Sequence, residues 1–311
     1  MVELLYKSPF ARVRKNTRIS STVILMGMIV TAIVSFQSNA QDVPHRYRFV
    51  TLNAPFPEVT QTLGYGINDL GAVVGDYNDI AGDHGFILEH DTYTAINVAL
   101  PGAQNTVAFG INNRREIVGS YTAGGVGYGF LLKDGVFATL DFPSSGVTQT
   151  QARGIDDQGR IVGFYDDAAG SHGFLFDHGV YTAIDVPFAG ACCTFASGIN
   201  DRGEIVGSYN GSDGRIHAFI REKGEFRTLD LPFPNNQALA YAINNRGEIG
   251  GTGFILDRES VTLLSTLSSE AVNAVALGVN DRGAIVGIAG NPEEFGFLLT
   301  PEWGLSAPNH E

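Results

Sequence analysis

The chain of 311 residues contains 33 acidic residues against 20 lysines and arginines, which gives a formal net charge of −13 at pH 7. This excess of negative charge argues against nucleic acids and anionic membrane surfaces as partners, because both are negatively charged themselves. The length suffices for one domain with a substantial interior, and no linker marks a second domain.

Residues 1–40 have the composition of a secretory signal peptide or anchor. Basic residues between positions 12 and 18 precede an apolar run at 23–34, and Ser38-Asn39-Ala40 is a suitable cleavage site. The apolar run is short for a membrane-spanning helix. We therefore expect cleavage and an extracytoplasmic protein, periplasmic or secreted, with an uncleaved anchor as the alternative.

From residue 66 onward the chain repeats one short sequence. The copies are GINDLGAVVG, GINNRREIVG, GIDDQGRIVG, GINDRGEIVG, AINNRGEIGG and GVNDRGAIVG, which begin at positions 66, 110, 154, 198, 242 and 278. The first four intervals are 44 residues long and the last is 36. A period of about 40–50 residues is typical of solenoids, propellers and tandem arrays.

Each repeat unit predicts four short strands. In residues 154–187, four runs rich in Val, Ile, Phe and Tyr alternate with clusters of Gly, Asp and Asn, which is the pattern of strands joined by hairpin turns. No stretch shows the apolar spacing of a helix. Four antiparallel strands in a unit of roughly 44 residues are typical of a β-propeller blade.

The two ends of the repeat region complement each other. Residues 49–55 match the fourth strand of a unit, as seen at 137–143, whereas the sixth unit stops after its third strand at 295–300. Pairing the two ends would complete the last blade and leave no exposed strand edge at the seam. We predict an all-β, six-bladed β-propeller spanning residues 41–311, with its ring closed by the N-terminal strand.

Most repeated residues are predicted to be structural. The Asn-Asp-x-Gly segments read as hairpin turns with a left-handed glycine, as at Gly71, and Arg115 replaces that glycine in the second unit. The first residue of each segment, such as Asn68, is expected to bond the turn backbone. Small residues recur two apart in each first strand, as at Gly64 and Gly66. They fit blades that crowd at the axis, and a ligand-lined channel is the alternative.

The third strands begin with His84-Gly-Phe, His172-Gly-Phe and His217-Ala-Phe in three of the units. The His-Ala-Phe string at 217–219 and the GINDRGEIVG string at 198–207 resemble the signatures of the HAF-repeat family of extracellular repeat proteins. The resemblance covers about residues 46–300. It implies an extracytoplasmic β-rich repeat protein and assigns no catalytic residues. Because the histidines lie on different blades, we expect hydrogen bonds within each blade and no shared metal.

The hairpins between second and third strands carry acidic residues, for example in 76–83. They are interpreted as polar surface turns, with calcium binding as the alternative. The fifth unit lacks eight residues here, which predicts a notch on this face. Cys192 and Cys193 are adjacent in the segment that joins the third and fourth units on the same face. A disulfide between neighbours is strained, so a loop pair of thiols is expected, with a vicinal disulfide as the alternative.

The favoured function is a non-enzymatic, monomeric binding protein for a glycan, a peptide or another protein, without a cofactor and without a membrane contact after cleavage. No nucleophile elbow, zinc motif or phosphate loop is present, so no catalytic residues are assigned. A hydrolase or lyase at the mouth of the axial channel, with or without Ca²⁺, is the first alternative, and a purely structural or self-assembling ring is the second. The predicted ligand-binding residues are Asp76, Asp79, Asp166, Asp167, Asp213, Cys192 and Cys193.

Overall fold

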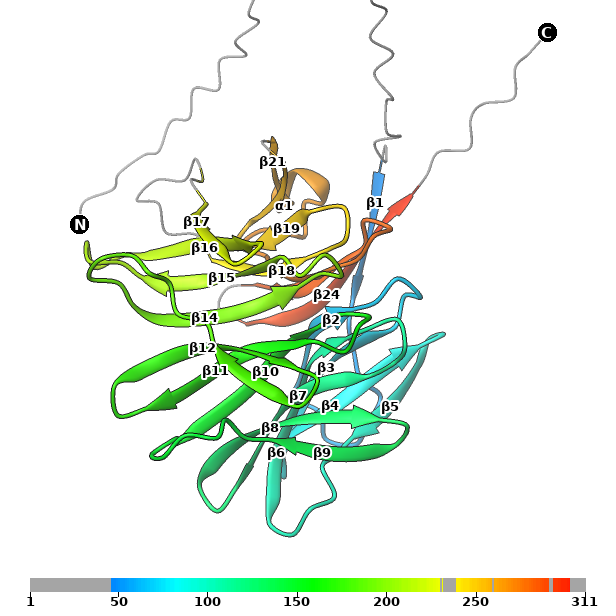
Figure 1. Ribbon diagram of the computed structural model, residues 1–311. Coiled ribbons are helices and arrows are strands. Elements are labelled where there is room, and N and C mark those ends of the chain that lie inside the picture. The colour runs from blue at the N-terminus through cyan, green and yellow to red at the C-terminus, as the bar shows by residue number, and fades with distance from the viewer. Residues whose placement is uncertain (1–45, 230, 232–238, 259, 291–292, 303–311) are drawn as a thin grey trace, which may run out of the picture. The chain divides into compact units, whose positions relative to one another are not determined.

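The computed structural model describes residues 46–229, 231, 239–258, 260–290 and 293–302. All of them belong to the unit Asp42–Glu311. The predicted signal peptide at 1–40 lies outside the described residues. The described part of the chain forms 24 strands and one short helix, and its fold is all-β and propeller-like (Figure 1).

Successive hairpins build four-stranded antiparallel sheets. One sheet contains β2 (Gln61–Ile67), β3 (Val73–Asp79), β4 (Gly82–Glu89) and β5 (Thr92–Ile96). Another contains β14 (Cys192–Ile199), β15 (Ile205–Asn210), β16 (Ile216–Glu222) and β17 (Glu225–Thr228). A third contains β18 (Ala240–Ile243), β19 (Glu248–Gly251), β20 (Phe254–Asp257) and β21 (Ser260–Leu263).

Two further units of four strands join into one eight-stranded sheet. The first unit contains β6 (Ala103–Ile111), β7 (Ile117–Ala123), β8 (Val126–Lys133) and β9 (Val136–Leu140). The second contains β10 (Gln149–Ile155), β11 (Ile161–Asp167), β12 (Gly170–Asp177) and β13 (Val180–Ala183). The connection between them is a single parallel contact of Gln149 in β10 with Gly127 in β8, so each unit keeps its own antiparallel pattern.

The remaining sheet combines the two ends of the described chain. It contains β22 (Val275–Val279), β23 (Ile285–Ala289), β24 (Phe295–Glu302) and β1 (Arg46–Thr51). β1 pairs with β24 antiparallel, in a register that runs from Arg46 opposite Glu302 to Thr51 opposite Phe297. Figure 1 shows the blue β1 beside the red β24. The first strands of successive units also contact one another in chain order, from β2 and β6 to β18 and β22. The last of them, β22, contacts β2.

The fifth unit departs from the others in its loops. The hairpin between β19 and β20 has only Thr252 and Gly253 between its strands, as the missing eight residues predict. Helix α1 (Leu264–Leu267) follows β21 directly, and Leu264 is fully buried. Among the described residues, no helix is long and apolar enough to cross a membrane.

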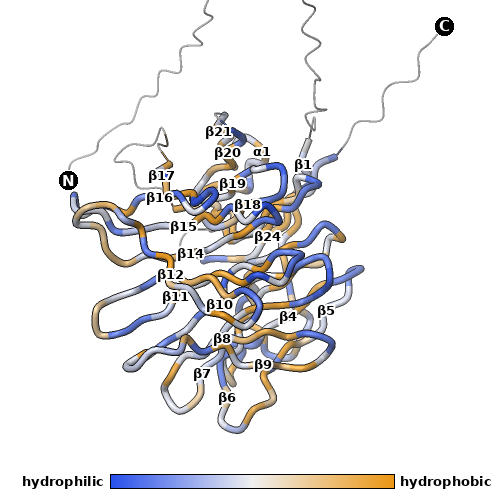
Figure 2. The backbone as a smooth tube through the Cα atoms, viewed as in Figure 1, coloured by the Kyte–Doolittle hydropathy of each residue, from blue (hydrophilic) through white to orange (hydrophobic). Residues whose placement is uncertain are grey.

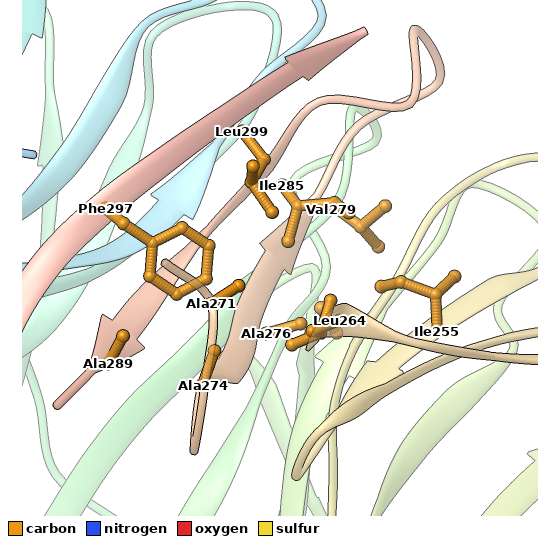
Figure 3. Packing of buried hydrophobic residues seen from close by; sticks show 11 residues of the cluster. Ile255, Leu264, Ala271, Ala274, Ala276, Val279, Ile285, Ala289, Phe297 and Leu299 are labelled. Carbon is orange, nitrogen blue, oxygen red and sulfur yellow. The ribbon is translucent and has the colours of Figure 1, made fainter. Parts of the chain in front are cut away.

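The core lies between neighbouring sheets, and each third strand contributes a phenylalanine to it. The largest fully buried side chains include Phe86, Phe130, Phe174, Phe219, Phe254 and Phe297. Figure 3 shows Phe297 of β24 packed with Ala271, Ala274 and Ala289. Figure 2 shows hydrophobic stretches along the strands, interrupted by hydrophilic ones. This alternation matches sheets that are buried by packing on one another.

The small residues of the first strands are required by close contact of backbones. A Cβ on Gly66 would lie 2.7 Å from the carbonyl oxygen of Phe109 and 3.1 Å from the Cα of Gly110. Gly278 would clash in the same way with the backbone of β2. The prediction that small residues allow the units to crowd together is therefore confirmed.

The predicted hairpin turns are also confirmed. Gly71 has φ +85°, and Arg115 adopts the same left-handed conformation at φ +62°. The side-chain oxygen of Asn68 accepts hydrogen bonds from the backbone N–H groups of Leu70 (3.1 Å) and Ala72 (2.9 Å). The repeated Asn-Asp-x-Gly sequence thus specifies a backbone geometry, and its residues are engaged in holding it.

Candidate functional site

The first hairpins meet in a ring of polar side chains. The backbone N–H of Asp69 donates to the side chain of Asn113 at 2.9 Å, and the same contact recurs from unit to unit. It returns to the start when the N–H of Asp281 donates to Asp69 Oδ1 at 2.7 Å. Amide groups separate several of the carboxylates, since Asn113 Nδ2 donates to both Asp69 and Asp157 at 2.8 Å. The ring encloses a volume of only about 80 Å³, so we assign it to structure.

A β-bulge interrupts every first strand at the same position. The pairing of β10 with β11 passes from Ala152 to Gly154 and skips Arg153, and β2 skips Tyr65 in the same way. In the described residues the six bulged positions are Tyr65, Phe109, Arg153, Ser197, Tyr241 and Leu277. A bulge frees one side chain from the alternation of the strand and re-aims it. The small residues on either side are the ones that pack against neighbouring backbone.

The six bulged side chains line one cavity of about 260 Å³. It is completed by three residues of second strands, by residues of the first strand β14 and the third strand β16, and by the residue before β18: Phe164, Ser208, Asn210, Phe195, Ile216 and Leu239. Because side chains from all six first strands converge here, we call it the axial cavity. Its wall is mainly aromatic and aliphatic with a few hydroxyl and amide groups, which is the composition typical of small-molecule sites. Asn210 and Ile216 border the β15–β16 hairpin, so the cavity extends toward the second-to-third hairpins.

Arg153 is the one charged residue among the described residues that line this cavity. Its guanidinium carbon lies 4.0 Å from the centre of the Phe109 ring and 5.5 Å from that of Phe164. Burial lowers the pKa of Arg153 to about 10, so the side chain stays protonated at neutral pH. The residue is nevertheless partly exposed, because the space beside it is the cavity.

Asp76 lies behind the cavity wall and contacts the lining residue Tyr65. Burial raises the pKa of Asp76 to about 7, and the contact with the Tyr65 hydroxyl lowers it by less. Burial and the neighbouring Asp76 raise the pKa of Tyr65. One carboxyl oxygen of Asp76 is buried without a hydrogen-bond partner among the described residues. Asp76 is therefore a carboxyl group that titrates near neutral pH next to the cavity.

Three of the predicted ligand-binding acids are engaged by the repeat histidines. His84 Nε2 lies 3.2 Å from Asp79, His172 Nε2 lies 3.4 Å from Asp167, and His217 Nε2 lies 3.0 Å from Asp213. Each ring also stacks on the tyrosine opposite it in its own sheet. The prediction that each histidine is held within its own blade is confirmed. These acids lie on separate hairpins, and each hairpin acid serves its local turn.

The other predicted residues lie near the cavity without lining it. Asp166 is in β11, and one of its carboxyl oxygens is buried without a partner among the described residues. Cys192 and Cys193 are the first residues of β14, where the sequence predicted a connecting loop. They are free thiols with their Sγ atoms 3.1 Å apart, and this contact raises the pKa of Cys192. Cys192 pairs with the cavity residue Asn210.

In the described part of the chain, no group of three or more His, Cys, Asp or Glu side chains is arranged to hold a metal ion. Calcium binding stays a prediction from the hairpin sequences.

The bulged residues were missed by reasoning from sequence, although a signal for them exists. Each lies between the two small residues of the first strand, as in Gly64-Tyr65-Gly66 and Ala152-Arg153-Gly154. The flanking residues are small in every unit, whereas the middle residue varies among Tyr, Phe, Arg, Ser and Leu. Variation at one position inside a strict repeat indicates a position that the repeat geometry leaves free for another role.

Comparisons with known proteins find propeller folds at low similarity. No family model matches the chain, and no curated protein matches it. A lectin of Aleuria aurantia in complex with Fucα1-6GlcNAc has 10% identity and a TM-score of 0.48, over 81% of this chain and 98% of that chain. AofleA of Arthrobotrys oligospora has 12% identity and a TM-score of 0.46, over 81% and 86%. The PQQ-bound aldose sugar dehydrogenase of Streptomyces coelicolor has 10% identity and a TM-score of 0.47, over 83% and 99%.

Proposed function

We propose that this protein is an extracytoplasmic, six-bladed β-propeller that binds a small ligand in its axial cavity. The ligand is a free small molecule or a single residue of a glycan or peptide, since the cavity of about 260 Å³ lies below the roughly 300–1,000 Å³ of drug-sized sites. The observation that carries the proposal is the bulge in every first strand, which brings six side chains of different chemistry to one place.

The six-bladed, closed ring is part of the proposal. It is supported by the pairing of β1 with β24 and by the hydrogen bond from Asn280 Nδ2 to the carbonyl oxygen of Asn68 at 2.9 Å. Relationship to the HAF-repeat proteins and export by the N-terminal 40 residues are proposed on the sequence signatures alone.

The test is a screen of sugars, amino acids and small organic acids against the full chain by thermal shift. We expect at least one compound to raise the melting temperature of the wild type. Ser197→Trp should abolish that shift, because the added indole fills the cavity. Thr182→Trp, at an exposed position of the outer strand β13, is the matched control and should keep it. A compound whose shift survives Ser197→Trp, or a complete lack of hits, would contradict the proposed site.

A second candidate function is a hydrolase or lyase that acts in the same cavity. It is favoured by Asp76, whose raised pKa of about 7 suits proton transfer at neutral pH through the lining residue Tyr65 that it contacts. In that case Asp76→Asn would bind the ligand as the wild type does but would leave it unchanged, whereas the wild type would convert it. Recovery of intact ligand after long incubation with the wild type would favour the binding function.

A further inference from the structure

The proposed function leaves open which ligand the axial cavity accepts, and Arg153 restricts the choice. Within the described residues, the contacts of its guanidinium group are with the faces of Phe109 and Phe164, and no carboxylate pairs with it. The inference below rests on the proposed function and names the ligand class for the same cavity.

Three arginines at the first hairpins differ from Arg153 because each forms an ion pair. Arg114, Arg202 and Arg246 each pair with the glutamate two residues further on, at 2.5–2.6 Å. These arginines are exposed to solvent, where an ion pair matters least. Arg153 is less exposed than these three, so its charge is more costly to leave uncompensated, and no carboxylate in the described part of the chain pairs with it. A ligand that supplies a negative charge would remove this cost.

The geometry of Arg153 suits a carboxylate in particular. When the face of a guanidinium group lies over an aromatic ring, the N–H groups at its edge point sideways and remain able to donate. Two parallel N–H groups match the two oxygens of a carboxylate, a fork that lysine lacks. Asp76 contacts the lining residue Tyr65, and no ion pair joins it to Arg153 among the described residues, so it does not fill that role.

The rest of the cavity suits an aromatic body. Phe164 and Phe195 meet edge to face with ring centres 5.0 Å apart, and Tyr65 and Phe109 do so at 5.2 Å. The edges and faces of these aromatic side chains can pack against the ring of an aromatic ligand. Tyr241 also lines the wall, and Ser197, Ser208 and Asn210 offer a few hydrogen bonds for a polar substituent.

We propose that the axial cavity binds a small aromatic carboxylate, with the carboxylate bonded to Arg153 and the ring packed among the aromatic side chains of the wall. A neutral sugar would use the polar groups and leave Arg153 without a counter-charge. Inorganic phosphate would supply the charge and leave the aromatic wall uncovered.

The test is isothermal titration of the full chain with phenylacetate, its neutral analogue phenylacetamide, acetate and inorganic phosphate. We expect phenylacetate to bind about 10- to 100-fold more tightly than phenylacetamide, the usual range for a charge-assisted bond. We expect a preference of about the same size over acetate and phosphate, because these two anions lack the ring that the aromatic wall buries. Arg153→Gln should remove the preference over phenylacetamide, and Arg153→Lys should keep part of it. Arg48→Gln, at an exposed position of β1, should leave all affinities unchanged.

Equal affinities for phenylacetate and phenylacetamide in the wild type would overturn the inference without any variant being needed. If both bind and Ser197→Trp abolishes both, the cavity is the binding site and only the ligand class is wrong. If phenylacetate fails to bind while a compound from the screen depends on position 197, the ligand class is again wrong alone. If no compound depends on position 197, the proposed function fails as well.

Discussion

The two ends of the axial region differ in how their polar groups are satisfied. At the first hairpins, the Asp or Asn side chain at one repeat position accepts a hydrogen bond from the backbone N–H of the neighbouring unit, and this chain of contacts returns to Asp69. At the bulges, the residue types differ from unit to unit, and Arg153 has no charged partner among the described residues. Repeated residues thus hold the fold together, whereas the variable position between them is the one available for a ligand.

The largest expected effect is a loss of stability when a residue of the first hairpins, Asn280, is replaced. Asn280 is buried, accepts hydrogen bonds from the N–H groups of Arg282 and Ala284, and donates to Asn68. Asn280→Ala leaves two buried partners, the N–H of Ala284 and the carbonyl oxygen of Asn68, unsatisfied at about 1–3 kcal/mol each. We expect the free energy of unfolding to fall by about 3–5 kcal/mol in urea denaturation while ligand affinity is kept. A loss of affinity without a loss of stability would reverse the assignment of the two ends.

The next largest effect is the contribution of Asp76 to stability, which depends on pH. Its pKa rises from 3.8 to about 7 on folding, so between these pH values the folded state keeps a proton that the unfolded state has released. The contribution of Asp76 to stability is therefore full below about pH 3.8 and is lost as the pH rises through 7.

Asp76→Asn should abolish this loss. Relative to the wild type, the variant should gain on the order of 3 kcal/mol between pH 4 and pH 8. The measurement is urea denaturation of both proteins at the two pH values. Parallel pH profiles would contradict the raised pKa and would also remove the support for acid–base chemistry at this residue.

Replacing Arg153 should change the free energy of unfolding in the opposite direction to Asn280→Ala. Arg153 is partly buried and its charge has no carboxylate partner among the described residues, so an apolar residue of similar shape removes a desolvation cost. We expect Arg153→Met to raise the free energy of unfolding by about 1–2 kcal/mol, the opposite of Asn280→Ala. A clear decrease in stability would mean that Arg153 serves the fold, as the hairpin residues do.

The smallest effect concerns the turn backbone alone. A Cβ on Gly71 would meet no atom within 4 Å, so only its φ of +85° resists substitution. Gly71→Ala should therefore cost about 1 kcal/mol of stability and leave binding unchanged. No change in stability would show that this turn accepts a side chain in the left-handed conformation without cost, the conformation that Arg115 adopts at the equivalent position.

The repeat made much of the local structure predictable. Turn glycines such as Gly71, small residues such as Gly66 and histidines such as His84 recur at fixed spacing, and each has one simple geometric reason. The match of residues 49–55 to a fourth strand likewise predicted that β1 pairs with β24.

The site was harder to predict, because a bulge changes the direction of one side chain without leaving a mark in the alternation of the strand. Arg153 and Tyr241 read as ordinary strand residues in the sequence. The acids Asp79, Asp167 and Asp213 were predicted to bind a ligand, but each one contacts the histidine of its own unit, which explains its position.

The most direct test of the account is a crystal structure of the full chain soaked with phenylacetate or with the best compound from the screen. The account predicts ligand density between Arg153 and Tyr241, surrounded by the bulged residues of the first strands. Density at the hairpins of Asp79, Asp167 and Asp213 with an empty axial cavity would contradict it.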